Sequence, residues 1–264
     1  MGCRNYYAFI HIGGTMELNK IYNEECIEGM KRIPDKSVDM ILCDLPYGTT
    51  GCKWDEIIPF EPLWEQYNRV IKDNGAIVLF ANQPFTTKLI YSNIKNFKYC
   101  WTWDKQIPSG MGYARFRPMQ QTEDVCVFEK KGRRTIYNAQ KTKREKPIKS
   151  GGVKRSDSAP HSMTKPLNKT YDYKNPVTLL SYRKIRKGSI HPTQKPVALF
   201  EYLIKTYTNE GETVLDNCMG SGTTAIACIN TNRNYIGFEL DEEYYNLANE
   251  RISKTLKSET LETR

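Results

Sequence analysis

The tetrapeptide Asp44-Leu45-Pro46-Tyr47 combines side-chain types that could act together on a nucleobase. An exocyclic amino group is conjugated with the ring of its base and is a poor nucleophile. A carboxylate and a backbone carbonyl that accept its two protons would favour a pyramidal, reactive nitrogen. Proline fixes the chain so that a carbonyl can point at a ligand, and tyrosine can stack on a base that has left its duplex. The same four residues also fit an ordinary β-turn, so both interpretations stay open.

A second stretch, residues 214–224, has the pattern of a strand, a Gly-x-Gly turn and the start of a helix. Gly220 and Gly222 let the backbone turn tightly and approach a ligand closely. Glu239, which ends the next predicted strand, can accept hydrogen bonds from ribose hydroxyls. The turn lacks the lysine of a phosphate-binding loop. The pattern predicts a site for a nucleoside cofactor without separating a dinucleotide from S-adenosylmethionine. A glycine-rich turn without a ligand is the alternative.

Alternating strands and helices must position these two stretches. Apolar runs predict strands over residues 38–43, 76–81, 97–103, 124–128, 213–216 and 234–239. Helical spacing predicts helices over residues 63–71, 84–91 and 223–229, and others that begin near residues 196 and 241. This alternation predicts a doubly wound α/β fold with a mostly parallel sheet. Asp44, Asp216 and Glu239 are then expected at the carboxyl ends of their strands.

The positive charge of the chain is concentrated in one segment. Residues 130–188 hold 18 Lys and Arg and three acidic residues, a net charge of +15, whereas the rest holds 21 basic and 27 acidic residues, or −6. Hydrophobic periodicity also disappears there. We therefore divide the chain into an extension (1–15), one half of a domain (16–129), an irregular basic insertion (130–189) and the other half (190–264). Such an insertion suggests a polyanion-facing module; a solvated loop is the alternative.

Together, the two stretches resemble the amino-methyltransferases of DNA, whose catalytic motif is Asp/Asn/Ser-Pro-Pro-Tyr/Phe. Leu45 departs from that motif, and Asn217-Cys218 replaces the Pro-Phe of the family's cofactor motif, Asp-Pro-Phe-x-Gly-Ser-Gly-Thr-Thr. Residues 191–196 and 236–241 resemble the family's segment before the cofactor helix and its ribose-binding strand. The catalytic motif precedes a variable basic region and then the cofactor motif, which resembles the permuted β group, with target recognition between the halves.

The resemblance implies direct in-line methyl transfer from S-adenosylmethionine to the exocyclic amino group of adenine, after the base has flipped out of double-stranded DNA. It implies catalytic roles for Asp44, Pro46 and Tyr47. Cofactor contacts are implied at Asp216, Cys218, Gly220, Ser221, Gly222, Thr223 and Glu239, and at Lys195 toward the methionine end. The distribution of charge adds candidate DNA contacts at Arg115, Arg117, Lys130, Lys131, Arg133, Arg134, Lys141, Lys143, Arg144, Arg183 and Arg186.

Several alternatives stay open at this point. Within the family, Asp44 favours adenine and a serine there would favour cytosine, so a cytosine amino methyltransferase is the first alternative. An RNA or protein methyltransferase is the second, and a catalytically inactive DNA-binding module belongs to a different class. A homodimer and a cognate restriction enzyme are open as partners.

The remaining composition indicates a cytoplasmic protein. The eight cysteines form no Cys-x-x-Cys pair and the three histidines are scattered, so we expect reduced thiols and no metal site. The apolar runs are too short for a membrane helix. Ile12-Gly13-Gly14-Thr15 precedes Met16, and the codons of such a run can contain a ribosome-binding sequence. We therefore expect translation from Met16, with the first 15 residues untranslated or disordered.

Overall fold

The computed structural model describes residues 8–9, 16–49, 55–149, 169–185 and 194–262. The chain forms two compact units, one made of Met1–Asn138 and Thr178–Arg264 and the other of Ala139–Val177. The strands of the first unit are β1 (Ala8–Phe9), β2 (Met16–Glu17), β3 (Lys20–Tyr22), β4 (Val38–Asp44), β5 (Ile71–Ala81), β6 (Phe97–Ser109), β7 (Gln120–Glu129), β10 (Leu179–Ser181), β11 (Thr213–Asp216) and β12 (Asn234–Phe238). Its helices are α1 (Cys26–Met30), α2 (Phe60–Val70), α3 (Phe85–Ser92), the short 3-10 helix η1 (Met111–Tyr113), α4 (Val197–Tyr207), α5 (Thr223–Asn230) and α6 (Glu242–Glu262).

Eight of these strands form one central sheet in the order β10-β6-β7-β5-β4-β11-β12-β3. β7 runs antiparallel to both of its neighbours, whereas the other described pairs in this sheet are parallel. The expected mostly parallel α/β sheet is therefore confirmed. Because β4 and β11 are adjacent, their carboxyl ends, which bear Asp44 and Asp216, lie side by side in the middle of the sheet.

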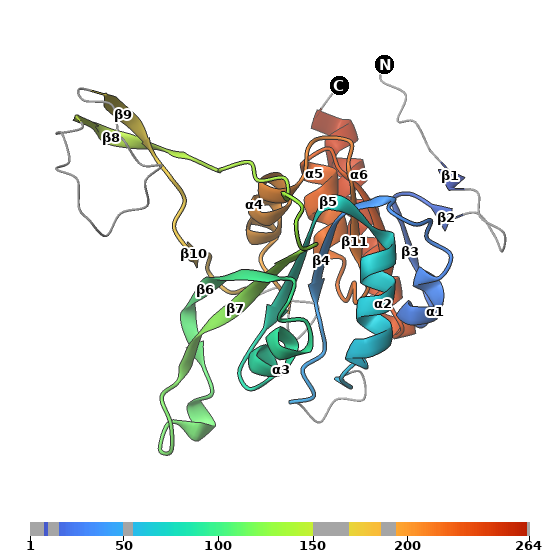
Figure 1. Ribbon diagram of the computed structural model, residues 1–264. Helices are drawn as coiled ribbons and strands as arrows, with labels where there is room; N and C mark the ends of the chain where they lie inside the picture. Colours follow the sequence, from blue (N-terminus) through green and yellow to red (C-terminus); the bar gives the residue numbers. More distant parts are fainter. Residues whose placement is uncertain (1–7, 10–15, 50–54, 150–168, 186–193, 263–264) are drawn as a thin grey trace. The chain divides into compact units, whose positions relative to one another are not determined.

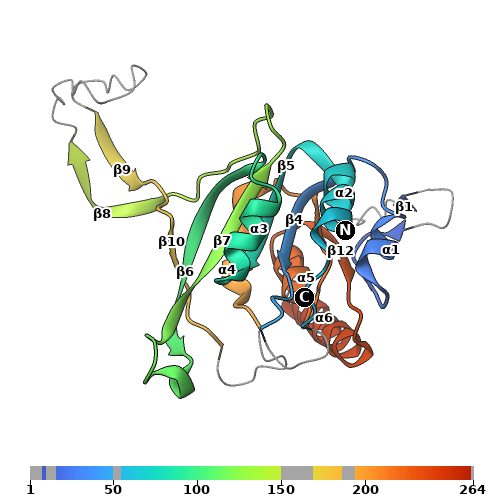
Figure 2. The ribbon, with the colours of Figure 1, turned by 60° about the horizontal axis from the view of Figure 1, so that its bottom comes forward.

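Helices cover both faces of this sheet, because its central strands are apolar on both sides. Along β4, Met40 and Leu42 belong to the core beneath α4 and α5, while Ile41 and Cys43 belong to the core beneath α1, α2 and α3. Figures 1 and 2 show these helices in two layers, with the sheet between them.

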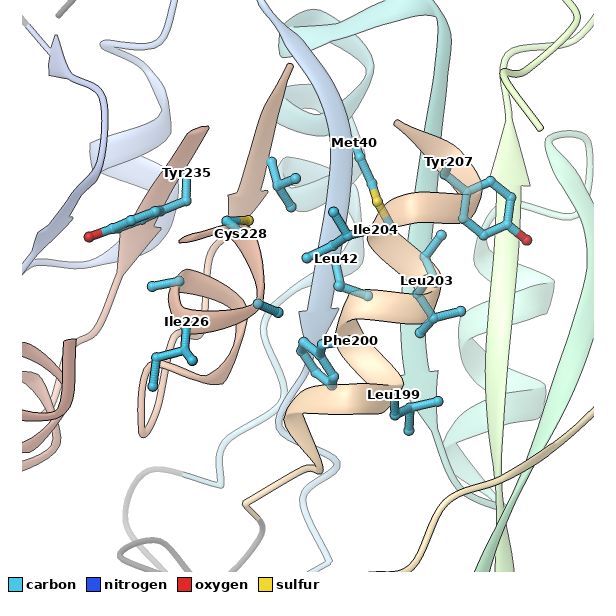
Figure 3. Close-up of a cluster of buried hydrophobic side chains, with 14 of the residues drawn as sticks. Met40, Leu42, Leu199, Phe200, Leu203, Ile204, Tyr207, Ile226, Cys228 and Tyr235 are labelled. Carbon is cyan, nitrogen blue, oxygen red and sulfur yellow. The ribbon is translucent and has the colours of Figure 1, made fainter. Parts of the chain in front are cut away.

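The core beneath α4 is built from large apolar side chains at helical spacing. Leu199, Phe200, Leu203 and Ile204 are all buried in the same cluster as Met40 and Leu42 of β4. Figure 3 shows Phe200 and Ile204 beside β4. Phe200 also stacks on Phe80 of β5, with ring centroids 5.1 Å apart. This packing fixes the start of α4, and therefore Lys195 just before it, against the end of β4.

The structure contains elements that periodicity did not reveal. β3 and α1 are only three and five residues long, too short for a visible hydrophobic pattern. Ile71, expected in a helix, has an extended backbone (ψ 136°) and begins β5. The basic segment supplies β10, which adds in parallel to β6, and the second unit contains an antiparallel pair, β8 (Thr142–Lys149) and β9 (Thr170–Lys174).

Some expectations fall outside the described residues. Arg186, residues 191–193 and most of the predicted extension 1–15 are among them. The described part of that extension, β1, pairs antiparallel with β2, which follows the extension. In the described part of the chain, no helix has the length and apolar character needed to cross a membrane.

Candidate active site

Both chemically interesting stretches line a single cavity of about 660 Å³ at the carboxyl ends of the central strands. Asp44 ends β4, Asp216 ends β11, and Glu239 directly follows β12. Ligands of open α/β sheets bind at this edge, because loops leave the sheet there in opposite directions. The cavity volume is typical of a site for a nucleoside-sized ligand.

Asp44 is held by two hydrogen bonds inside this cavity. The Tyr47 hydroxyl donates to Asp44 Oδ1 at 2.7 Å, and the Lys195 ammonium donates to Oδ2, also at 2.7 Å. Burial raises the pKa of the Asp44 carboxyl, and the Lys195 charge opposes that rise. Burial and the neighbouring Asp44 carboxylate hold the pKa of Tyr47 well above its usual value, so its hydroxyl keeps its proton.

The loop after Asp44 is fixed by an acid that the sequence analysis did not single out. The Asp55 carboxylate accepts the backbone N–H groups of Tyr47, Gly48 and Thr49 at 2.8, 2.9 and 2.8 Å. Asp55 is buried, and Gly48 has a positive φ of 66°, which glycine adopts readily. Tyr47 also packs on Phe85, with ring centroids 5.2 Å apart. An aspartate soon after a glycine-containing turn was the available signal.

Glu123 was also missed, although its position in β7 gave a signal. Charged Glu123 is in phase with the buried residues Val125 and Val127, so it points into the core beneath α4. Its carboxylate lies 3.2 Å from the Lys195 ammonium and 3.1 Å from that of Lys105. These two cations lower the pKa of Glu123 against the effect of its burial. The sequence analysis implied a cofactor contact for Lys195, but its ammonium contacts carboxylates in the structure.

On the other side of the cavity, two acids organise the glycine turn. Asp216 accepts the backbone N–H of Cys218 at 3.0 Å and the hydroxyl hydrogen of Thr224. Burial raises the pKa of Asp216 to about 6. Glu239 accepts the backbone N–H of Gly220 at 2.7 Å and that of Asp241 at 3.0 Å. Asp216 and Glu239 therefore fix the backbone of the glycine turn where it lines the cavity.

Most of the expected cofactor residues line this cavity. Cys218, Gly220, Ser221 and Thr223 do, together with Asp216, Glu239 and Lys195. Gly222 is not among the lining residues; it has a φ of 76° and faces Ala248 of α6, where an added Cβ would lie 3.2 Å from that side chain. A glycine is therefore required at position 222 by the turn and by the packing against α6.

The Asn217-Cys218 pair makes its own contacts where the family motif has Pro-Phe. The Asn217 side chain is buried; it accepts the Tyr67 hydroxyl hydrogen and points its amide nitrogen at the thiols of Cys26 and Cys218, at 3.6 and 3.4 Å. The hydrogen bond with Cys218, followed by burial, raises the pKa of Cys26; that bond lowers the pKa of Cys218, but Cys43 and burial raise it well above its usual value. These thiols stay protonated and form a weakly polar wall of the cavity.

The charge of the cavity discriminates between the two cofactor classes that the sequence left open. Nine acidic residues and two lysines line it. Such a negative site disfavours the pyrophosphate of a dinucleotide and suits a positively charged sulfonium. Glu239, at the end of its strand, is placed to accept hydrogen bonds from ribose hydroxyls. The residues present therefore fit S-adenosylmethionine.

The structure separates the candidate DNA contacts instead of bringing them together. Arg115 and Arg117 lie in the β6–β7 connection, on the same edge of the sheet as Asp44, and Figure 2 shows this hairpin projecting beyond the other strands. Arg183 follows β10 and reaches this edge too. Sequence analysis missed Lys184, which lines the cavity.

Other candidates lie at the opposite edge, because β7 runs antiparallel and delivers its C-terminal end there. Lys130 binds the backbone carbonyl of Ile71 at 2.8 Å and Asp73 at 3.3 Å, and Arg133 lies 4.0 Å from Asp73. Lys131 and Arg134 belong to the same segment. Lys141, Lys143 and Arg144 belong to the second unit, in which Arg144 donates to the Tyr173 carbonyl at 3.2 Å.

With this geometry in place, comparisons with known proteins identify the family. The family model described as DNA methylase matches residues 38–250. The chain belongs to the N6-adenine and N4-cytosine DNA methylase family. Its members use S-adenosylmethionine, which agrees with the charge of the cavity.

Relatives of this DNA methylase match it over nearly its whole length. Type II methyltransferase M1.MboII of Moraxella bovis is 30% identical and covers 89% of this chain and 96% of its own. DNA adenine methyltransferase YhdJ of Escherichia coli (strain K12) is 27% identical, covering 89% and 83%. The crystal structure of the M1.HpyAVI–SAM complex aligns with a TM-score of 0.60 at 28% identity, over 88% of this chain and 98% of that one.

Proposed function

We propose that this DNA methylase transfers a methyl group to the exocyclic amino nitrogen of adenine in double-stranded DNA. The observation that carries the proposal is the placement of the Asp44 carboxylate in the cavity that the cofactor turn also lines, with one oxygen bonded to the Tyr47 hydroxyl. Membership of the family is compatible with adenine or cytosine. Asp44 supports adenine, as does the likeness to an adenine methyltransferase.

In this proposal the loop after β4 holds the flipped base. One amino hydrogen is donated to Asp44 Oδ1, in place of the Tyr47 hydroxyl, and the other to the backbone carbonyl at Pro46. The Tyr47 ring stacks on the base. Asp55 holds the Tyr47–Thr49 backbone in place, so the ring and the carboxylate keep their relative positions. This fixed arrangement supplies much of the acceleration through proximity and orientation.

The cofactor half presents the second reactant from the neighbouring strand ends. S-adenosylmethionine supplies an electrophilic methyl group on its sulfonium. Asp216, the turn from Cys218 to Thr223 and Glu239 form its site, and the acidic lining favours its positive charge. As the new N–C bond would form, the methyl–sulfur bond would break and leave neutral S-adenosylhomocysteine, so the positive charge would pass from sulfur to the base nitrogen, which would then lose one proton. The buried Asp44 carboxylate accepts that proton, because burial raises its pKa.

We assign contact with DNA to two sets of basic residues, one at the edge of the sheet that bears Asp44 and one in the second unit. We propose phosphate contacts at Arg115, Arg117 and Arg183, and recognition of the target sequence by the insertion, including Lys141, Lys143 and Arg144. Lys130, Lys131, Arg133 and Arg134 have weaker support, because Lys130 and Arg133 are engaged with Asp73 at the opposite edge.

One experiment tests the proposed reaction. The purified protein is incubated with labelled S-adenosylmethionine and plasmid DNA from a methylation-deficient bacterium, and the digested nucleosides are separated by mass. We expect N6-methyladenine, and none from the Asp44→Ala variant, which still binds the cofactor. Asp35→Ala is the matched control, because its side chain is 71% exposed and precedes β4 at the opposite edge. N4-methylcytosine as the product would overturn the choice of base, and an active Asp44→Ala would overturn the mechanism.

A further inference from the structure

Four charged side chains of alternating sign form a row that begins at Asp44, continues along the cavity wall through Lys195 and Glu123, and ends at Lys105, which is not among the lining residues. Asp44 contacts Lys195 at 2.7 Å, Lys195 contacts Glu123 at 3.2 Å, and Glu123 contacts Lys105 at 3.1 Å. The side chains of Lys105, Lys195 and Glu123 are 3, 7 and 13% exposed. They come from β6, from the segment before α4 and from β7, so the row joins parts of the chain far apart in sequence.

Such a row is not explained by stability. Removing charges from water is costly, and well-packed apolar residues stabilise a core as well as a buried ion pair does or better. The surroundings are apolar: the Lys195 ammonium lies 5.3 Å from the centroid of the Phe80 ring and 5.7 Å from that of Trp103. The charges are therefore best explained by a task performed at the end of the row, which is Asp44.

We propose that Lys195 is a positioning residue for Asp44, and that Glu123 and Lys105 hold Lys195 in place. Lys195 occupies Asp44 Oδ2 and favours the ionised form of the carboxyl before the base arrives. Oδ1, bonded to the mobile hydroxyl hydrogen of Tyr47, is then the oxygen that exchanges this partner for the amino group. This inference rests on the proposed function.

The groups that face Asp44 support this assignment. They are Cys43 on its own strand, Tyr47 in the loop, Asp216 at the end of β11, Glu123 on β7 and Lys195 before α4. Among these, Lys195 carries the positive charge, while burial and Glu123 raise the pKa of Asp44. Loss of Lys195 should therefore leave Asp44 protonated to a higher pH, and a protonated carboxyl has fewer acceptor sites for the amino group.

The assignment differs measurably from a cofactor contact. A lysine that binds the methionine end would weaken cofactor binding when removed, and saturating cofactor would restore the rate. A lysine that positions Asp44 would leave cofactor affinity nearly unchanged and lower the rate at saturation. The acidic limb of the pH–rate profile reports the protonation of the essential carboxylate.

The test compares Lys195→Met, Lys195→Arg and Glu123→Gln in single-turnover methylation of unmethylated plasmid DNA, at saturating cofactor, as a function of pH. Cofactor affinity is measured separately by calorimetry. We expect Lys195→Met to lower the rate at neutral pH by about 100-fold, the usual loss for one electrostatic contact at a reacting group, with its acidic limb at higher pH. Lys195→Arg keeps the charge and should restore most of the rate.

Glu123→Gln makes the test independent of how well Lys195→Met folds. Removing the Glu123 charge should lower the pKa of Asp44 and move the acidic limb to lower pH, opposite to Lys195→Met, while a less constrained Lys195 lowers the rate about tenfold. Weaker cofactor binding with a normal saturated rate in Lys195→Met would overturn the inference, as would limbs that do not move. If Asp44→Ala itself is fully active, the proposed function has failed instead.

Discussion

The two edges of the central sheet carry acids of very different character. At the carboxyl edge, Asp216 and Glu239 are buried and Asp44 is largely so, and all three line one cavity. At the opposite edge, Asp73 is 38% exposed and pairs with Lys36, Lys130 and Arg133. Exposed pairs of this kind contribute little to stability. The direction of the strands thus decides where a charged residue can do chemistry, and it divides a basic segment that looks continuous in the sequence.

The largest expected effect distinguishes the two edges directly. Asp44→Asn should lower the single-turnover rate at saturating cofactor by at least about 1,000-fold, since the amide has lost the negative charge that stabilises the base nitrogen as it accepts the methyl group. Asp73→Asn, at the opposite edge, should change the rate less than about twofold. Rapid-quench measurements with labelled cofactor give both values. Comparable losses in the two variants would remove the distinction between the edges.

A second prediction concerns the pH dependence of stability at the carboxyl edge. The pKa of Asp216 is raised to about 6, so the folded protein binds its proton more tightly than the unfolded chain. The free energy of unfolding should therefore fall as pH rises from about 4 to 6, by on the order of 3 kcal/mol from this group. Asp216→Asn should remove that slope, because the amide does not bind a proton in this pH range. The hydrogen bond with Thr224 can be kept, because the Thr224 hydroxyl can turn to donate to the amide oxygen or to accept from its nitrogen.

Urea titrations of the cofactor-free protein at several pH values would measure this slope. Asp73 serves as the comparison, because Lys36 and Lys130 lower its pKa. Its contribution to the free energy of unfolding therefore rises with pH, opposite to that of Asp216. If Asp216→Asn shows the same change of unfolding free energy with pH as the unsubstituted protein, Asp216 is not the responsible group.

The third effect is smaller and tests how the loop after β4 is held. Asp55→Ala should lower the rate about tenfold at saturating DNA and cofactor, because three backbone N–H groups lose their acceptor and Tyr47 is no longer fixed relative to Asp44. Cofactor affinity should hardly change. The pH–rate profile should keep its shape, which separates this loop from the Lys195 row.

The smallest effects concern DNA affinity. Arg115→Gln and Arg117→Gln should each reduce the slope of log affinity against log salt by about 0.9, the value for one lost phosphate contact. Arg133→Gln and Arg134→Gln, at the opposite edge, should leave the slope unchanged. Fluorescence anisotropy with a duplex over a range of salt concentrations provides the measurement. Equal changes in both pairs would mean that DNA also contacts the opposite edge.

Much of the site could be predicted from the sequence because strand ends are visible in it. The apolar runs before Asp44, Asp216 and Glu239 fixed three strand ends, and a parallel sheet brings such ends to one edge. The central strands and the helices flanking the cofactor turn followed from the same periodicity. Elements of three to five residues, such as β3 and α1, carry too few side chains for a pattern to emerge.

Contacts between distant segments could not be predicted in the same way. The pairing of Lys195 with Asp44 and Glu123 depends on strand order, because β7 lies beside β5 although β6 precedes it in the chain. The reversal at the β6–β7 hairpin also sends Lys130 to the opposite edge, and nothing local in the sequence marks that direction. Asp55 could have been recognised only as a turn residue.

The way the second unit is attached has a consequence for how such enzymes diversify. Ala139–Val177 is one continuous stretch whose flanking residues are both tied to the first unit. Asn138 donates to the carbonyls of Thr206 and Thr208, and the Thr178 carbonyl accepts the Thr102 N–H. Exchanging the stretch between these two anchors would leave strand order and cavity intact. If this stretch recognises the target as proposed above, we expect target preference to be transferable as a cassette, with the methylation chemistry inherited unchanged by each chimera.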